Sequence, residues 1–187
     1  MSSSILTSLP SLKVTKHFIA RHGLVPNSSA TSKPMLIYHS VFSPSATKSS
    51  ISAHLSKTNV IEPHWTYSMY PTSHFHSTTH EVLIILRGSA RLLFGGEANP
   101  EKVETDVCKG DAIVLPAGMA HRLVEDKSGD FQMLGCYPVG AARWDMCYGK
   151  EGEGDVEGRI KDLKWFEKDP LYGSEGPALE ACSGITA

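Results

Sequence analysis

Short apolar runs alternate with turn-forming residues from about Trp65 onward. Seven such runs follow one another at a spacing of about ten residues, separated by Gly, Pro, Asp and Lys-Gly. They are HWTYSMY, EVLIILRG, SARLLFGG, KVETDVCKG, DAIVLPAG, HRLVEDK and DFQMLGCYPVG. Short strands at this spacing predict an all-β sandwich or barrel.

The flanking segments have different patterns. PMLIYHSVF (34–42) has the apolar and aromatic bias of a further strand. ISAHLSKTNV (51–60) predicts a short helix or an irregular crossing, with Ser49 or Ser50 as the N-cap. The sequence VEGRIKDLKWF, which starts at Val156, has the apolar spacing of one helical stretch.

These patterns divide the chain into three parts. Residues 1–33 form an N-terminal extension, residues 34–145 a single β-barrel domain, and residues 146–187 a tail of helix and loop. From Asp145 onward there are ten Asp and Glu residues against five Lys and Arg residues. We expect this acidic tail to pack on the barrel, because it is too short to form a domain.

The run EVLIILRG is apolar on both faces of the predicted strand, although a strand buried on one side should alternate. A second element must therefore cover the outer face. The candidates are a partner subunit, the segment 34–42 and the acidic tail, and we expect a homodimer. Leu83 and Ile85 share the face of Glu81, and Val82, Ile84 and Leu86 form the other face.

Composition excludes several classes of protein. The 187 residues suffice for one core, and the net charge of −2 gives no indication of a nucleic-acid or membrane partner. No phosphate-loop, nucleophile-elbow or zinc-finger signature is present. The first 61 residues contain six Lys and Arg residues and no Asp or Glu, which is a weak transit-peptide signal or a flexible leader.

The cysteines indicate the compartment. Cys108, Cys136, Cys147 and Cys182 lack C-x-x-C spacing and are too sparse for a disulfide scaffold of this length. We therefore expect free thiols in a reducing compartment and a cytoplasmic protein.

The stretch SHFHSTTHEVLIILRG gathers three histidines and a glutamate just before a buried strand. His74 and His76 are two residues apart, so in an extended chain they share a face and can bind one cation. Glu81 opens the next strand and offers a carboxylate. His80 would point to the opposite face unless a bulge exchanges the two. His121, after a Pro-Ala-Gly turn, is the candidate for the fourth ligand.

The spacing of these residues resembles the two motifs of the cupin superfamily. The first is His74-x-His76-x4-Glu81-x6-Gly88, and the second, Gly110-x5-Pro116-x-Gly118-x2-His121, follows after 21 residues. Two frequent family positions differ, since Ser68 stands in place of glycine and Glu125 in place of asparagine. Neither of these two is a metal ligand in the family pattern.

Most of the chain resembles the YjlB-like cupins, through GLVPNSS, MLIYHSVF, HFHSTTHEVLIILRGSARLLFGG, GDAIVLPAGMAH, YPVGAARWD and DPLYGSEGP. The resemblance implies an RmlC-like jelly-roll barrel in which His74, His76, Glu81 and His121 hold one divalent transition metal. Ligands of this kind suit Fe, Mn, Ni, Co, Cu or Zn, and the sequence does not choose among them.

Such a site implies a metal-dependent enzyme that acts on a small organic molecule in secondary metabolism, most simply an oxygenase or dioxygenase (an oxidoreductase). The alternatives are a non-redox isomerase or dehydratase and a ligand-binding cupin without turnover. Tyr70 and His80 are the candidate catalytic residues, with His80 as a general base at the mouth of the site. We interpret Trp65, Tyr137 and similar inward-facing residues as filling of the barrel rather than as substrate contacts.

Overall fold

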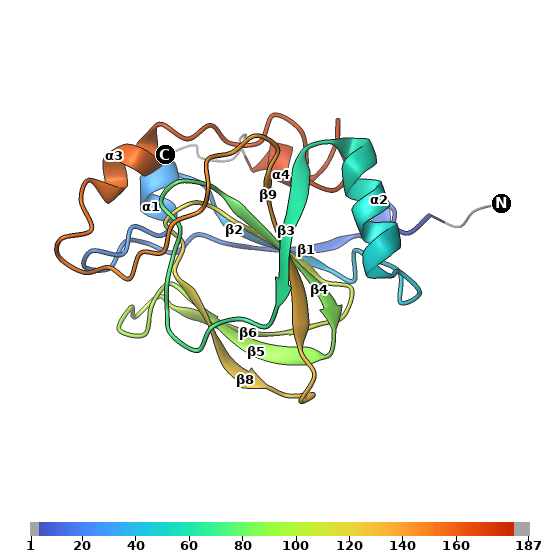
Figure 1. Ribbon diagram of the computed structural model, residues 1–187, viewed down its shortest axis with the longest axis horizontal. Helices are drawn as coiled ribbons and strands as arrows, with labels where there is room; N and C mark the ends of the chain where they lie inside the picture. The colour runs from blue at the N-terminus through green and yellow to red at the C-terminus, as the bar shows by residue number, and fades with distance from the viewer. Residues whose placement is uncertain (1–3, 182–187) are drawn as a thin grey trace.

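The computed structural model describes residues 4–181, in which nine strands form two antiparallel sheets (Figure 1). The larger sheet has the order β1-β2-β7-β4-β9-β3 and the smaller one the order β6-β5-β8. The strands are β1 (Lys13–His17), β2 (Met35–His39), β3 (Ile61–Tyr67), β4 (Glu81–Arg87), β5 (Ser89–Phe94), β6 (Val103–Cys108), β7 (Ala112–Leu115), β8 (His121–Asp126) and β9 (Gln132–Pro138). This is the all-β jelly roll that the sequence predicts.

Five short helical elements accompany the sheets. They are the 3-10 helix η1 (Leu9–Ser11), α1 (Ser28–Thr31), α2 (Lys48–Thr58), α3 (Val156–Lys161) and α4 (Pro177–Glu180). The N-cap of α2 is Thr47, not Ser49 or Ser50, because Thr47 and Ser50 exchange a capping box. Helix α3 ends at Lys161, sooner than the apolar spacing predicts. No helix within residues 4–181 is long and apolar enough to cross a membrane.

The two sheets enclose an apolar core. Alternate residues of β4 point into it, among them Leu83 and Ile85, and meet Phe94 from β5 of the other sheet. The chain passes from β4 to β5 at Gly88, whose φ of 72° lies in the left-handed region that glycine adopts without strain.

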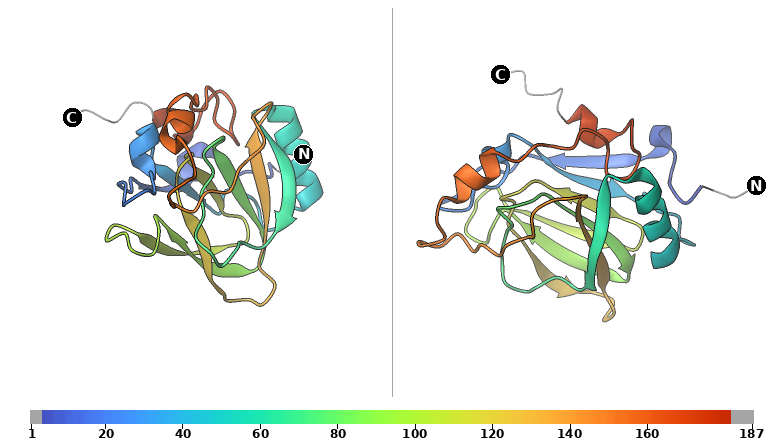
Figure 2. Two further views of the ribbon diagram at one scale, coloured as in Figure 1. Left: turned by 60° about the vertical axis from the view of Figure 1, so that its left-hand side comes forward. Right: turned by 45° about the horizontal axis from the view of Figure 1, so that its top comes forward.

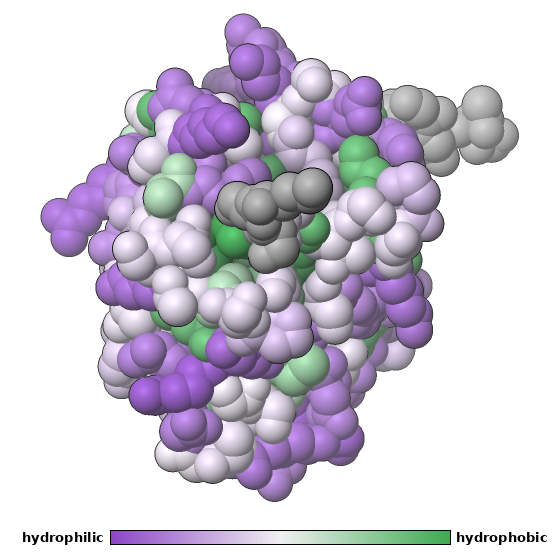
Figure 3. All heavy atoms as spheres, turned by 90° about the vertical axis from the view of Figure 1, so that its right-hand side faces the viewer, coloured by the Kyte–Doolittle hydropathy of each residue, from purple (hydrophilic) through white to green (hydrophobic). Residues whose placement is uncertain are grey.

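The outer face of β4 is covered by other parts of the same chain (Figure 2). Helix α2 and the tail lie over it, and β2 is a strand of the same sheet rather than a cover. Strand β1, from the predicted N-terminal extension, extends that sheet beyond β2. The doubly apolar face of β4 is thus explained within one chain. On the α2 side of the molecule, exposed apolar residues lie in small groups between polar ones (Figure 3).

One buried carboxylate holds the tail to the sheet. Asp169 is fully buried. Its Oδ2 accepts hydrogen bonds from Tyr38 Oη at 2.7 Å and from the Ala178 N–H at 3.0 Å, and its Oδ1 accepts from the N–H groups of Leu171 and Tyr172 at 2.9 and 3.0 Å. Both oxygens of Asp169 therefore have partners inside the protein.

Candidate metal centre

Backbone pairing brings the two histidine segments together. His74 and His121 form an isolated antiparallel bridge, with N–H to carbonyl distances of 3.2 and 2.9 Å in the two directions. The residue between His74 and His76, Phe75, pairs in the same way with Cys147. The loop before β4 is therefore held between the start of β8 and the segment after β9. His74 and His76 share a face without belonging to a regular strand.

The four predicted ligands meet at one point. Ligand nitrogens of His74, His76 and His121 lie within 4.8 Å of one another. Glu81 Oε1 is 3.4 Å from His76 Nε2, and Glu81 Oε2 is 3.3 Å from His121 Nε2. All four side chains are buried. Three buried imidazoles and a buried carboxylate that converge in this way are typical of a metal site.

The hydrogen bonds of the imidazoles leave their Nε2 atoms free. His74 Nδ1 lies 3.0 Å from the carbonyl of Thr72, and His121 Nδ1 lies 2.9 Å from the carbonyl of Met119. His76 Nδ1 contacts the carbonyl of Asp145. A carbonyl only accepts, so each Nδ1 carries the hydrogen and each Nε2 presents a lone pair. This is the tautomer that a metal-binding imidazole requires.

Glu81 supplies the negative charge. Burial alone would raise the pKa of Glu81, but the neighbouring His76 and the hydrogen bond from Tyr137 outweigh it and hold the pKa at about 2. Burial opposes the charged form of His76 too, yet Glu81 raises its pKa. Burial and the neighbouring His74 lower the pKa of His121 to about 3. The centre thus combines one carboxylate with imidazoles that can be neutral.

One oxygen of Glu81 has no partner. Oε1 accepts a hydrogen bond from Tyr137 Oη at 2.8 Å, whereas the buried Oε2 accepts none. A buried acceptor without a donor costs about 1–3 kcal/mol, and more when it is charged. A divalent cation between the Nε2 lone pairs and this oxygen would remove that cost. The residues present therefore fit a metal ion held by His74, His76, Glu81 and His121.

Tyr137 belongs to a chain of hydrogen bonds that sequence reasoning missed. Trp65 Nε1 donates to Tyr137 Oη at 2.9 Å, and Tyr137 donates onward to Glu81. The indole of Trp65 lies flat against Gly135 of β9, where a Cβ would stand 1.9 Å from the ring. Glycine at this position is therefore what admits Trp65. Strands β4 and β9 are antiparallel and pair Val82 with Cys136, so Tyr137 lies opposite Glu81. A correct prediction of this pairing would have identified Tyr137 as a neighbour of Glu81.

The segment after β9 closes one side of the site. Asp145 accepts hydrogen bonds from the Ser77 N–H at 2.7 Å and from the Ser77 hydroxyl, and its own carbonyl faces His76 Nδ1. Arg159 Nε donates to the same hydroxyl at 2.7 Å. These contacts place Trp144 beside the centre, with its ring centroid 5.7 Å from that of His76. The segment after β9 has no hydrophobic periodicity, so the sequence pattern does not predict that Trp144 lies beside the centre.

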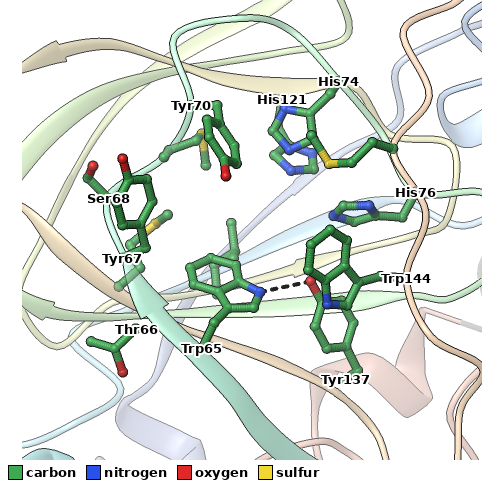
Figure 4. A pocket seen from close by; sticks show the side chains of 14 residues that line it. Trp65, Thr66, Tyr67, Ser68, Tyr70, His74, His76, His121, Tyr137 and Trp144 are labelled. Carbon is green, nitrogen blue, oxygen red and sulfur yellow. Dashed lines mark hydrogen bonds between the residues drawn. The ribbon is translucent and has the colours of Figure 1, made fainter.

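A cavity of about 300 Å³ opens beside the imidazoles. Figure 4 shows the three rings on one side, Tyr67 and Tyr70 across from them, and Trp65 between. The cavity is lined by Trp65, Thr66, Tyr67, Ser68, Met69, Tyr70, His74, His76, Leu83, His121, Met133, Tyr137, Trp144 and Met146. Trp65 and Tyr137, which the sequence analysis interprets as filling of the barrel, thus line this space, and their lack of contact with a substrate stays a prediction.

The two predicted catalytic residues lie in different places. Tyr70 is half exposed at the mouth of the cavity, with its ring centroid 5.7 Å from that of His74. His80 is buried outside the cavity, where its Nδ1 accepts the Ala117 N–H at 2.9 Å and its ring packs on Trp165 and Phe166. Burial lowers the pKa of His80 to about 4. His80 is thus not at the mouth, because the tail covers the face to which it points.

Two comparisons of the sequence with known proteins give matches. A sequence model of the family described as Cupin matches residues 49–133. The uncharacterized protein YjlB of Bacillus subtilis (strain 168) is 42% identical over 120 residues, which are 62% of this chain and 68% of that protein.

Solved structures give weaker likenesses. A variant of oxalate decarboxylase from Bacillus subtilis is 18% identical with a TM-score of 0.37, over 62% of this chain. Procruciferin, an 11S globulin from Brassica napus, is 12% identical with a TM-score of 0.36, over 73% of this chain. The chain spans 28% of the length of each of these two structures.

Proposed function

Because this chain belongs to the cupin family, we propose that it is a metal-dependent enzyme that acts on a small organic molecule, with an oxygenase reaction as the simplest form. One observation carries the proposal. Nε2 lone pairs of buried imidazoles and an unpaired carboxylate oxygen converge at the wall of a cavity of about 300 Å³. That volume lies at the lower end of the range for small-molecule sites.

The metal would be Fe, Mn, Ni, Co, Cu or Zn, all of which accept nitrogen and oxygen ligands. When bound, it supplies a Lewis acid for a substrate oxygen or, if it is redox-active, a place where oxygen and substrate meet. The chain's own residues do the rest. Carbonyl groups fix the imidazole tautomers, Tyr137 orients Glu81, and the aromatic walls exclude water from the bound molecule. Tyr70 stands where it can orient a substrate that enters.

Metal analysis tests the first half of the proposal. Protein purified without added metal should contain about one transition-metal ion per chain, measured by inductively coupled plasma mass spectrometry. His121→Ala should lose this ion, and His17→Ala should keep it, because His17 lies on the edge strand β1 and lines no part of the cavity. Wild-type protein that binds no metal in stoichiometric amount, even after Fe(II), Mn(II) or Zn(II) is supplied, would refute the metal centre.

Oxygen measurements test the second half. Fe(II)-loaded and Zn(II)-loaded protein are each incubated with catechol and with acetylacetone in an oxygen electrode, and the products are followed by mass spectrometry. Oxygen uptake that needs both Fe(II) and His121 supports the oxygenase. Turnover by the zinc form without oxygen uptake favours an isomerase or dehydratase. Binding without turnover in either form favours a ligand-binding cupin.

The proposal also covers the cellular compartment, the oligomeric state and the metabolic role of the protein. A reducing compartment such as the cytoplasm agrees with Cys108, Cys136 and Cys147, which are free thiols, while Cys182 lies outside the described residues. A homodimer remains a prediction that analytical ultracentrifugation would test. The apolar outer face of β4 does not require one, because the same chain covers it. A role in secondary metabolism would be tested by the genes that neighbour this one.

A further inference from the structure

The cavity wall carries charge only at the metal centre. No lysine, arginine, aspartate or glutamate is among the 14 described residues that line it. The wall is made instead of aromatic rings and thioethers, with the hydroxyl groups of Thr66 and Ser68 on the side away from the imidazoles. A ligand inside the cavity therefore meets one charged group, which is the centre itself.

The charge of that centre can be counted. The three imidazoles are neutral when their Nε2 atoms bind a metal, because each Nδ1 keeps its hydrogen against a carbonyl. Glu81 contributes one negative charge when its carboxylate, which lies between His76 and His121, binds a cation. A divalent cation on these ligands leaves one net positive charge. One negative charge on a ligand makes the site neutral, and a second would be buried without compensation, which is costly.

The walls define the shape of the ligand. Trp65, Tyr137 and Trp144 lie on one side of the space, and Tyr67 and Tyr70 lie across it (Figure 4). Aromatic walls favour a flat ligand that stacks or meets a ring edge. A cavity of about 150 Å³ is enough for benzene, so a cavity of about 300 Å³ has room for one or two rings.

We propose, on the basis of the function proposed above, that the substrate is a planar molecule of one or two rings with two neighbouring oxygens that ionises once. Phenols with an adjacent oxygen and enols beside a carbonyl meet this description. Two neighbouring oxygens can chelate the metal, and the single ionisation matches the single positive charge. Dicarboxylates and phosphate esters are excluded by their second charge. An aromatic cage by itself would suit an organic cation, but the positive centre repels one.

Binding measurements with zinc-loaded protein test this inference without relying on turnover. Tropolone, a flat ring with two adjacent oxygens and one acidic proton, is compared with the oxalate dianion by isothermal titration calorimetry. Each affinity is divided by the affinity of the same ligand for free zinc, and zinc retention is checked afterwards. Tropolone should be favoured over oxalate by at least about tenfold on this scale. Oxalate that binds as well as tropolone would overturn the inference.

Variants of the cavity wall test whether its aromatic rings and its lack of charge cause the preference for tropolone. Trp144→Leu should weaken tropolone binding about tenfold, whereas Trp165→Leu, which alters a tryptophan outside the cavity, should leave it unchanged. Ser68→Arg adds a positive charge to the wall and should raise the affinity for oxalate about tenfold without helping tropolone. If tropolone bound metal-free protein as tightly as zinc-loaded protein, the inference that it chelates the metal would be wrong. A wild-type protein that retains no zinc would instead refute the metal centre, and that outcome is read from zinc content alone.

Discussion

Three carboxylates are buried within residues 4–181, and two of them, Glu81 and Asp169, lie on opposite sides of the larger sheet and differ in the hydrogen bonds they accept. Asp169, under the tail, receives four hydrogen bonds shared between its two oxygens. Glu81, at the metal centre, receives one from Tyr137, and its other oxygen has none. A carboxylate whose acceptors are filled stabilises a fold, whereas one with a free buried oxygen is prepared for a cation. Burial alone does not distinguish the two, and the count of donors does.

The same division separates two neighbours in sequence. His80 and Glu81 point to opposite sides of the sheet, His80 toward Trp165 and Phe166 of the tail and Glu81 toward the other imidazoles. Both are buried. His80 has a role in packing because the tail covers its side, and Glu81 has a role in binding because the cavity lies nearby.

Removal of the filled carboxylate should have the largest effect on folding. Asp169→Ala leaves the Tyr38 hydroxyl and three backbone N–H groups without their acceptor. Each buried donor without an acceptor costs about 1–3 kcal/mol, so we expect the free energy of unfolding to fall by about 4 kcal/mol in total. Urea denaturation of metal-free protein measures it.

The control is Asp162→Ala, an exposed aspartate of the same tail, which should change stability by less than about 0.5 kcal/mol. If Asp169→Ala does not fold, Asp169→Asn gives a milder version of the same change. A loss at Asp169 no larger than that at Asp162 would show that its four hydrogen bonds contribute nothing net.

Removal of the open carboxylate should affect binding instead. Glu81→Gln keeps an oxygen that can accept from Tyr137 but removes the charge that a cation needs. Changes to residues that only support a metal ligand cost 10–100-fold in affinity, so loss of the ligand charge should cost at least about 100-fold. Competition with a chelator measures the metal affinity. The unfolding free energy of metal-free protein should fall by less than about 2 kcal/mol, well below the effect at Asp169.

Acid should destabilise the protein through His80. Its pKa is lowered by burial to about 4 from the ordinary value of 6.5. Between these two values the unfolded chain takes up a proton that the folded chain does not, so stability falls as pH falls. At pH 5 this contribution amounts to about 2 kcal/mol relative to pH 7.5. Urea denaturation at the two pH values, with a chelator present, measures the loss.

A variant assigns this loss to His80. In His80→Asn the amide oxygen can accept the Ala117 N–H in place of Nδ1, and no proton is taken up. The variant should therefore lose about 2 kcal/mol less than wild type between pH 7.5 and pH 5. The same loss in both proteins would mean that His80 already titrates normally in the folded state.

The sequence predicts the parts of this molecule that follow a period or a motif. The strands were found because apolar residues and turn signals alternate, and the ligands because their spacing matches a known pattern. Asp145, Trp144 and Met146 were missed because they lie in irregular chain, whose path depends on contacts with Ser77 and His76. The alternation of side chains along a strand predicts that His80 points away from Glu81. It does not predict that the tail covers the side to which His80 points.

The smallest change to each carboxylate removes one tyrosine hydroxyl that donates a hydrogen bond to it. Tyr38→Phe takes one of four donors from Asp169, and Tyr137→Phe takes from Glu81 the one donor that it has within residues 4–181. The first should lower the unfolding free energy by about 1.5 kcal/mol and leave metal affinity unchanged. The second should lower metal affinity about tenfold, because an unsupported carboxylate is less well oriented. Chelator competition and the visible spectrum of cobalt-substituted protein separate the two. Equal effects of both variants on metal affinity would mean that the tail and the metal centre are coupled through the sheet, and that the number of donors does not divide structure from function.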